Sequence, residues 1–448
     1  MRLNMTLQQM ASVMHGRLIS TDPQMKVQAL VTDSRVVGNG DVFIALKGQK
    51  FDARQFIPDV LARGAAAVIA EEDGFTVPAG SQASFILVKQ ALPALQELAK
   101  YHRLHSTLKV AAITGSNGKS TTKQMLRAIC QTCGETVANM GNFNNQFGVP
   151  FSLLEIQPKH HYGVFELGAS HVGDIREIAS LAVPDVAVIT TVSPAHLEFF
   201  KDLETVYKTK TEIVDCLNKG GTLVYNADNE YLARLNTEFT GKRISFGFKA
   251  GADVQVLETE IFSFIYQKKA YVFQLHLERH NKLNAAAAVA AALALGIDME
   301  HIQKGLLTFT PMPMRLERIT KNGVSFILDC YNANPASMEN ALVILGHEPQ
   351  HPRVAVLGDM KELGASSQKY HQAVAQQLVD NGIEVAFLAG PEMKAAYEVL
   401  QKAAGIHVYY APQAQEWTAE LKKQLAQGGT CLLKASRSMN FETIFKEL

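Results

Sequence analysis

Residues 112–123, which read AITGSNGKSTTK, constrain this chain more than any other segment. Gly115 and Gly118 let successive backbone N–H groups converge on an anion. Lys119 can then reach terminal phosphates, and the Ser120 hydroxyl can bind the magnesium ion that accompanies them. An apolar run precedes the loop and a helical pattern follows it, which is the context such a motif requires. The segment therefore predicts an ATP-binding loop between a strand and a helix.

The loop is more compact than the common P-loop. Five residues before Gly118 the chain has Ile113, where the pattern GxxxxGK[ST] requires glycine. An ordinary glycine-rich turn is the alternative interpretation, but it does not explain why Lys-Ser-Thr-Thr enters the helix. We therefore favour nucleotide binding.

Length and charge limit the classes of partner. A chain of 448 residues has room for roughly three domains. Its 43 basic and 43 acidic residues give no electrostatic footprint for nucleic acid. The N-terminal segment has no signal-peptide pattern, and no apolar stretch reaches the length of a membrane span. We expect a cytoplasmic protein that binds small molecules, with no nucleic-acid partner and no membrane insertion.

The five cysteines are too few and too scattered for a disulfide framework, which fits a reducing compartment. Cys130 and Cys133 have a CxxC spacing, but no second pair follows them. We interpret them as buried small hydrophobes rather than as half of a zinc site.

The predicted fold class is α/β with three domains. Residues 1–90 mix short strand-like runs with a helix and predict a small N-terminal α/β domain. Residues 91–313 alternate apolar strands with helices and predict a central P-loop ATPase-like domain on a parallel sheet. Prolines 311 and 313 mark a linker. Residues 314–448 then predict a C-terminal Rossmann-like α/β domain, with strands at 324–328, 353–357, 385–388 and 430–433.

One segment of the central region has a different pattern. Residues 254–277 alternate apolar and polar side chains, as half-buried strands do. They predict antiparallel strands appended to the central domain.

Two further strands of the central region end in polar residues. The run 162–165 leads into Glu166, and the run 186–189 leads to a loop that contains His196. Ligands of open α/β sheets bind outside the carboxyl ends of the strands, so Ser120, Glu166 and His196 could approach one magnesium–nucleotide complex. The alternative is a solvated glutamate and an unrelated loop histidine.

Four longer motifs resemble the Mur ligases of peptidoglycan synthesis, which are ATP-dependent amide-forming enzymes with three domains and a compact TGxNGK[ST] loop. The motifs are GNFNNQFGVP at 141–150, FELGASHVGDI at 165–175, SPAHLEFF at 193–200 and YNANPASM at 331–338. They resemble most the branch that adds D-alanyl-D-alanine to UDP-N-acetylmuramoyl-tripeptide, and the DNPR signature of the preceding step is absent. The resemblance implies ATP, Mg²⁺, an acyl-phosphate intermediate and a monomer in the bacterial cytoplasm.

The resemblance also implies roles for single residues. Lys119 would hold the β and γ phosphates, Ser120 and Glu166 would bind one magnesium ion, and His196 would serve a second metal site. Lys210 aligns with a lysine that family members carbamylate to obtain another anionic ligand. The catalytic set is then Lys119, Glu166, His196 and carbamylated Lys210, and the metal ligands are Ser120, Glu166, His196 and Lys210.

The remaining implied contacts are to substrates. For ATP they are Gly115, Ser116, Asn117, Gly118, Lys119, Ser120, Thr121, Asn281, Asn284, Arg315 and Asp329. For the UDP-linked substrate they are Ser34, Arg35, Lys47, Asn142, Asn144, Asn145 and Ser170. For the dipeptide and the acyl phosphate they are Asn332, Asn334, Lys434, Ser436 and Arg437. The chain departs from the family pattern in three places. Ala53 and Arg54 replace the last two residues of FDGH, Thr209 stands before Lys210 where a small residue is usual, and Ala435 replaces a glycine.

Three alternatives stay open on the sequence. A folylpolyglutamate synthase shares the compact loop, although the NFNNQ and YNANP segments favour the cell-wall enzyme. A P-loop kinase or regulatory ATPase would use ATP without forming an amide. A non-catalytic nucleotide-binding scaffold would be expected to have lost Lys119, Glu166 or His196, and all three are present.

Overall fold

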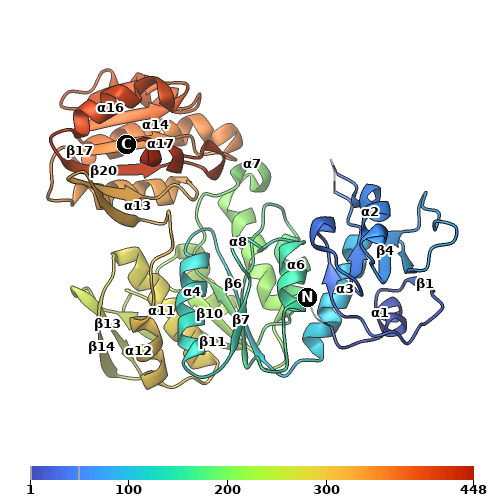
Figure 1. Cartoon of the computed structure of the whole chain (residues 1–448). Helices are drawn as coiled ribbons and strands as arrows, with labels where there is room; N and C mark the ends of the chain where they lie inside the picture. The colour runs from blue at the N-terminus through green and yellow to red at the C-terminus, as the bar shows by residue number, and fades with distance from the viewer. Residues whose placement is uncertain (1–2, 49–50) are drawn as a thin grey trace.

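The computed structural model describes residues 3–48 and 51–448, and these residues form three β-sheets with helices packed against them (Figure 1). The N-terminal sheet has the strand order β1-β5-β4-β3-β2, with β1 antiparallel to β5 and the other neighbours parallel. Its strands are β1 (Arg17–Ile19), β2 (Leu30–Val31), β3 (Val42–Ile44), β4 (Ala67–Glu71) and β5 (Ser84–Val88), and its helices are α1 (Leu7–Val13) and α2 (Ile57–Ala62). A capping box between Thr6 and Gln9 starts α1.

The central sheet has nine strands in the order β14-β13-β12-β11-β10-β9-β6-β8-β7. All neighbours from β7 to β12 run parallel, and β13 and β14 close the sheet as an antiparallel pair. The strands are β6 (Lys109–Thr114), β7 (Thr136–Ala138), β8 (Tyr162–Glu166), β9 (Val186–Ile189), β10 (Thr222–Asn226), β11 (Lys242–Gly247), β12 (Val254–Val256), β13 (Ile261–Tyr266) and β14 (Lys269–His276). The predicted antiparallel strands over 254–277 are present, since β13 pairs antiparallel with both β12 and β14. β12 also pairs parallel with β11 and so continues the central sheet.

Helices cover both faces of the central sheet. Two hydrophobic clusters lie on its two sides, one beneath α3, α5 and α6 and the other beneath α4, α11 and α12. The helices of this part are α3 (Ala91–Leu104), α4 (Lys119–Gln131), α5 (Gly148–Leu154), α6 (Asp174–Ala182), α7 (Leu197–Phe200), α8 (Leu203–Thr211), α9 (Glu230–Ala233), α10 (Leu235–Glu238), α11 (Arg279–Ala294) and α12 (Met299–Leu307).

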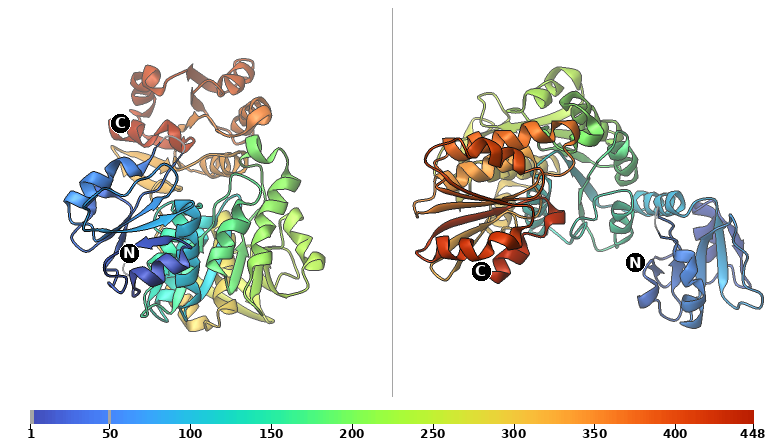
Figure 2. Two further views of the ribbon diagram at one scale, coloured as in Figure 1. Left: turned by 90° about the vertical axis from the view of Figure 1, so that its right-hand side faces the viewer. Right: turned by 90° about the horizontal axis from the view of Figure 1, so that it is seen from above.

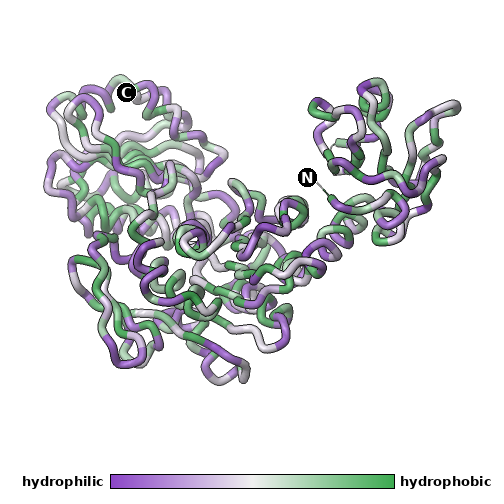
Figure 3. The backbone as a smooth tube through the Cα atoms, turned by 60° about the horizontal axis from the view of Figure 1, so that its bottom comes forward, coloured by the Kyte–Doolittle hydropathy of each residue, from purple (hydrophilic) through white to green (hydrophobic). Residues whose placement is uncertain are grey.

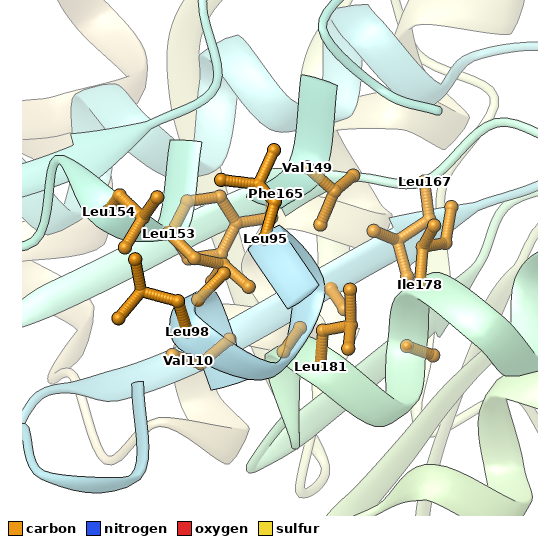
Figure 4. Close-up of a cluster of buried hydrophobic side chains, with 14 of the residues drawn as sticks. Leu95, Leu98, Val110, Val149, Leu153, Leu154, Phe165, Leu167, Ile178 and Leu181 are labelled. Carbon is orange, nitrogen blue, oxygen red and sulfur yellow. The ribbon is translucent and has the colours of Figure 1, made fainter. Parts of the chain in front are cut away.

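Helix α3 carries the chain from the N-terminal sheet onto the central one. Its apolar residues recur at the helical spacing of three and four, and Leu95 and Leu98 are fully buried. They lie in one cluster with Leu153 of α5, Phe165 of β8 and Ile178 of α6 (Figure 4). This packing fixes α3 to the domain that contains the nucleotide loop.

Helix α11 is buried on every side over residues 285–292, which are alanines apart from Val289. Side chains this small let α11 pack closely against α4 and the strands β9–β12 at once. Helix α4 begins directly after the nucleotide loop, so this packing supports the loop from below.

The C-terminal sheet has the order β15-β16-β20-β17-β18-β19, with only β15 antiparallel to its neighbour. Its strands are β15 (Glu317–Lys321), β16 (Val324–Leu328), β17 (Arg353–Gly358), β18 (Val385–Ala389), β19 (His407–Ala411) and β20 (Gly429–Lys434). Its helices are α13 (Pro335–Gly346), α14 (Ser367–Asp380), α15 (Lys394–Leu400), α16 (Thr418–Leu425) and α17 (Glu442–Glu447). Its inner strands are the hydrophobic stretches visible in Figure 3. The four predicted strands are present, and β15 and β19 were not predicted.

The N-terminal and C-terminal sheets lie on opposite sides of the central part (Figures 1 and 2). The predicted α/β class with three sheet-containing parts is confirmed. The domain boundaries at 90/91 and 313/314 stay predictions. No helix among residues 3–48 and 51–448 is long and apolar enough to cross a membrane.

The connection between the central and C-terminal sheets has an unusual backbone. Met314 and Leu316 have positive φ angles of 58° and 52°, and Arg315 lies between them. Residues other than glycine are strained at positive φ angles, so contacts with neighbouring residues must hold this backbone conformation in place. The Met314 N–H donates to Glu317 and its carbonyl accepts from the Tyr331 N–H, at 2.8 and 3.2 Å.

Candidate functional site

The predicted ATP-binding loop joins β6 to α4 at the carboxyl end of the central sheet. Gly115 and Gly118 have φ angles of 144° and 83°. A Cβ atom on Gly115 would lie 2.1 Å from the Thr190 hydroxyl oxygen, and one on Gly118 would lie 2.3 Å from Asn284 Oδ1. Both positions therefore require glycine, for backbone conformation and for space.

Lys119 lies across this loop. Its ammonium donates to the carbonyls of Gly115 and Ser116, at 2.7 and 3.3 Å. Burial lowers the pKa of Lys119, as does the nearby Arg315, while Glu166 opposes the shift. The loop, its lysine and the start of α4, where backbone N–H groups have no partner within the helix, together form a site suited to phosphates.

Glu166 ends β8 and stands beside Ile113 of β6 in the register of the sheet. Its Oε1 accepts a hydrogen bond from Asn144 at 2.8 Å, while its buried Oε2 has no hydrogen-bond partner. The Lys123 ammonium lies 3.8 Å from Oε2. Burial favours a higher pKa for Glu166, but Lys119, Lys123 and hydrogen bonds from Ser120 and Asn144 outweigh it and lower the pKa. The carboxylate is thus ionised, and one of its oxygens accepts no hydrogen bond.

The donors present fit one magnesium ion with oxygen ligands. Within residues 3–48 and 51–448, no three His, Cys, Asp or Glu side chains gather as a metal site. A cation here would take the unpartnered Glu166 oxygen, the Ser120 hydroxyl and phosphate oxygens, which are the hard ligands that Mg²⁺ prefers. The Ser120 hydroxyl accepts from Arg315 at 2.9 Å.

His196 stands where the central part meets the C-terminal one. It has a φ angle of 53° and precedes α7. Its Nδ1 lies 2.5 Å from a carboxylate oxygen of Glu362, and the Glu198 N–H donates to the Glu362 carbonyl at 3.1 Å. Glu362 was not predicted. Its contact with His196 spans 166 residues of sequence, and no local sequence pattern predicts such a contact.

Lys210 lies near the end of α8, and its side chain is 2% exposed. Burial, assisted by the charge of Lys119, lowers the pKa of Lys210 to about 7, although Asp174 and Glu212 oppose the shift. A buried lysine that is partly neutral near pH 7 has a nucleophilic amine. Its ammonium lies 5.5 Å from the centre of the Phe200 ring, and Lys210 does not line the cavities described next.

Three adjoining cavities bring most of the predicted residues together. A cavity of about 500 Å³ is lined by residues 116–120, Asn144, Asn145, Glu166, Ser170, His196, Arg315, Asp329, Asn332, Asn334 and Lys434. A second, of about 290 Å³, is lined by Asn117, Gly118, Thr121, Asn281, Asn284, Arg315 and Asp329. A third, of about 480 Å³, is lined by Ser116, Lys119, Asn142, His196, Asn332, Asn334, Ser436 and Arg437.

Four predicted residues lie outside these cavities besides Lys210. Gly115 belongs to the nucleotide loop but does not border the cavities. Ser34, Arg35 and Lys47 belong to the N-terminal part, at one side of the central sheet (Figure 1). Arg35 is exposed, and its guanidinium forms a two-armed ion pair with Asp33.

The C-terminal part contributes three charged groups, Arg315, Asp329 and Lys434, to the cavity of about 500 Å³. Arg315 stacks on Tyr331, its guanidinium carbon lying 4.1 Å from the ring centre. Asp329 forms an ion pair with Lys434, whose side chain is 1% exposed, and Lys434 also donates to the Asn332 carbonyl at 3.2 Å. The cavity is therefore complete only where the two parts of the chain meet.

Sequence reasoning missed several residues that border the cavities. Asp174 accepts the N–H groups of Ser170 and His171. Tyr331 holds Arg315, and His280 borders the second cavity, where burial is the main cause that lowers its pKa to about 4. Asp174 and Tyr331 belong to the motifs at 165–175 and 331–338. Their position next to predicted ligands in those motifs was the signal that could have identified them.

Comparison with known proteins gives concordant matches along the chain. Family models match residues 26–103 ("Mur ligase family, catalytic domain"), 113–292 ("Mur ligase middle domain") and 314–437 ("Mur ligase, glutamate ligase domain"). A relative from Escherichia coli (strain K12), named UDP-N-acetylmuramoyl-tripeptide--D-alanyl-D-alanine ligase, is 34% identical, with 100% of this chain and 98% of the relative covered.

Solved structures agree. MurF from Acinetobacter baumannii superposes with a TM-score of 0.92 at 32% identity, covering 100% of this chain and 99% of that one. MurF ligase from Thermotoga maritima, solved in complex with ADP, has a TM-score of 0.83 at 29% identity and covers 93% and 96%.

Proposed function

This chain belongs to the Mur ligase family, and we propose that it is an ATP-dependent ligase that joins D-alanyl-D-alanine to UDP-N-acetylmuramoyl-tripeptide. The product is the pentapeptide precursor of peptidoglycan. The observation that carries the proposal is the cavity of about 500 Å³, in which a phosphate-binding loop, an ionised carboxylate and charged groups from the C-terminal part meet. The named relatives, which align over the whole chain, support the choice of substrates.

The reaction requires that a carboxylate be activated before an amine attacks it. The terminal carboxylate of the tripeptide takes the γ-phosphoryl group of ATP, which gives an acyl phosphate and ADP. The amine of D-alanyl-D-alanine then adds to the acyl carbon, loses a proton and displaces phosphate, which forms the amide. Mg²⁺ supplies charge neutralisation to the phosphoryl oxygens.

The chain's own residues would orient the substrates and neutralise the charge of the phosphates. Lys119 and the loop N–H groups would hold the terminal phosphates, and Arg315 would add charge from the C-terminal part. Asn281 and Asn284 border the second cavity and would contact the nucleoside, since an asparagine amide offers both a donor and an acceptor. Glu166 and Ser120 would hold the cation.

The UDP-linked substrate and the dipeptide would bind on either side of the nucleotide. Ser34, Arg35 and Lys47 would hold the UDP end, with the tripeptide running along the asparagines of the loop 142–145. The third cavity, bordered by Ser436 and Arg437, would receive the dipeptide. The proposal includes a monomer, as the family resemblance implies, and both ATP and the UDP-linked substrate point to the bacterial cytoplasm.

The test of the proposal is phosphate release from ATP in the presence of UDP-N-acetylmuramoyl-tripeptide, with and without D-alanyl-D-alanine. Release that depends on the dipeptide, with a matching UDP-linked pentapeptide in the mass spectrum, is the expected result. Release that is indifferent to the dipeptide would instead indicate a kinase or ATPase. Release that requires a folate and glutamate would indicate a folylpolyglutamate synthase.

Glu166→Gln should weaken the binding of Mg²⁺ to the ADP-loaded protein by at least roughly tenfold, because a neutral amide replaces the ionised oxygen. Calorimetric titration of the ADP complex with Mg²⁺ measures this directly, without turnover. Glu230→Gln is the matched control, since Glu230 is exposed at the start of α9. Equal Mg²⁺ affinity in both variants would contradict the metal assignment.

Lys210 should form a carbamate, because a neutral amine adds CO₂ and releases a proton. With a pKa of about 7, the neutral amine is the minor form at pH 6 and the major form at pH 8, so carbamylation should rise across this interval. ¹³C NMR in ¹³C-bicarbonate should show one carbamate signal that is absent from Lys210→Ala. Lys208→Ala, which changes an exposed lysine of the same helix, should retain the signal. A spectrum without the signal at pH 8 would exclude the modification.

A further inference from the structure

Two asparagines from distant parts of the chain face each other between the central and C-terminal parts. Asn117 lies in the nucleotide loop, and Asn334 immediately precedes α13 of the C-terminal part. The Asn334 Nδ2 donates to Asn117 Oδ1 at 2.8 Å, and the Asn117 Nδ2 donates to Asn334 Oδ1 at 3.2 Å. The two amides thus form a reciprocal pair of hydrogen bonds across 217 residues of sequence.

Both amides are oriented by their own parts of the chain. Asn334 caps α13, since its Oδ1 accepts the Ser337 N–H at 2.9 Å and its own N–H donates to the Ser337 hydroxyl at 3.0 Å. Pro335 fixes the first turn of the helix. Asn117 is held in the central part, because its Nδ2 also donates to the Ser193 hydroxyl at 3.1 Å.

The hydrogen-bonding capacity of Asn334 is nearly exhausted. A side-chain amide offers two donors and two acceptor positions. The oxygen of Asn334 receives Ser337 and Asn117, and its nitrogen gives one hydrogen to Asn117, so a single N–H remains for any ligand. Asn334 is therefore better suited to join two parts of the protein than to recognise the dipeptide.

A second contact involves the same helix. The Asn340 side chain, further along α13, lies 3.2 Å from Nδ1 of His280, a residue of the second cavity. Helix α13 thus touches the central part at the nucleotide loop and again beside Asn281 and Asn284. Both contacts can form only while the C-terminal part is docked.

We propose that Asn334 is a positioning residue, which docks the C-terminal part onto the nucleotide loop through Asn117 and thereby brings Arg315 and Asp329 to the bound nucleotide. The inference rests on the proposed function only in that the loop binds a nucleotide. It predicts that Asn334 affects nucleotide binding before any dipeptide is present.

The test is the affinity for ADP with Mg²⁺, in the absence of both other substrates. Asn334→Ser keeps a good helix cap but withdraws the groups that reach Asn117. We expect ADP to bind about three- to tenfold more weakly, which corresponds to one or two ordinary hydrogen bonds. Asn117→Ala should lose affinity too, and Asn334→Ser should then add almost nothing, because the shared contact is already gone.

Other results would overturn the proposal. If Asn334 served only the dipeptide, Asn334→Ser would leave ADP binding unchanged and raise the KM for D-alanyl-D-alanine. If it only stabilised α13, its effect would be equal with and without Asn117. Asn334→Gly also retains a tolerated helix cap without the amide, and it replaces Asn334→Ser should that variant fold poorly, as judged by the fluorescence of Trp417. A protein that binds ADP with this coupling but forms no amide would refute the ligase and leave the docking role intact.

Discussion

Replacing Lys119 by alanine should lower the turnover number of the ligation reaction by about a hundred- to a thousandfold, the effect of deleting one preorganised charged donor. The ammonium lies within the phosphate loop, bonded to the Gly115 and Ser116 carbonyls, so it is oriented before the nucleotide arrives. It would neutralise charge that grows on the phosphoryl oxygens during transfer. Steady-state measurement of dipeptide-dependent phosphate release determines the turnover number.

Lys219→Ala is the matched control for this variant. Lys219 is exposed and precedes β10, so it lies at the edge of the sheet opposite the carboxyl ends of the parallel strands. Its replacement should leave turnover within about twofold of the unmodified protein, as expected for a surface change away from the site. An unchanged turnover number in Lys119→Ala would refute the assignment of the loop to the transferred phosphate.

Replacing Lys434 by methionine should destabilise the C-terminal part by about 2–3 kcal/mol, below the full cost of breaking a buried ion pair, because Asp329 loses its partner but is itself 14% exposed. The Asn332 carbonyl would also lose a donor. Trp417 is the single tryptophan and is buried in the C-terminal core, so its fluorescence during urea denaturation reports the unfolding of this part.

The double variant Asp329→Asn, Lys434→Met tests the cause of this loss. Removing both charges should recover part of the stability lost in Lys434→Met, because no uncompensated buried charge remains. If the double variant were less stable than Lys434→Met by the full additional cost of an independent substitution, the ion pair would not be the reason. The comparison therefore separates lost charge pairing from lost packing.

Sequence patterns located the parts of the site that local chemistry determines. The nucleotide loop follows from glycine, lysine and hydroxyl spacing, and the buried strands β16, β17, β18 and β20 follow from continuous apolar runs. The edge strands β15 and β19 escaped because they are polar or half exposed, with the sequences ERITK and HVYYA. Edge strands need only one covered side, so their hydrophobic signal is weak.

Contacts between distant segments could not be predicted in this way. The His196–Glu362 and Asn117–Asn334 pairs depend on how one sheet docks on another, and no spacing in either segment encodes that. The burial of Lys210 was signalled only weakly. It lies four residues after the buried Val206 on the same face of α8, but lysine side chains are mostly exposed in proteins. The residue roles that the family resemblance implies stay predictions until the variants above are measured.

The backbone on either side of Arg315 has a consequence for how tightly nucleotide can be held. Met314 is kept in the left-handed region by its hydrogen bonds with Glu317 and Tyr331, and the Arg315 guanidinium stacks on Tyr331. The conformational entropy of this long side chain and its flanking residues is therefore lost when the chain folds, not when ATP arrives. A glycine at position 314 would relieve the backbone strain, but it would also let this segment move before ATP binds. ATP binding would then have to order the segment, so the variant should bind ATP more weakly.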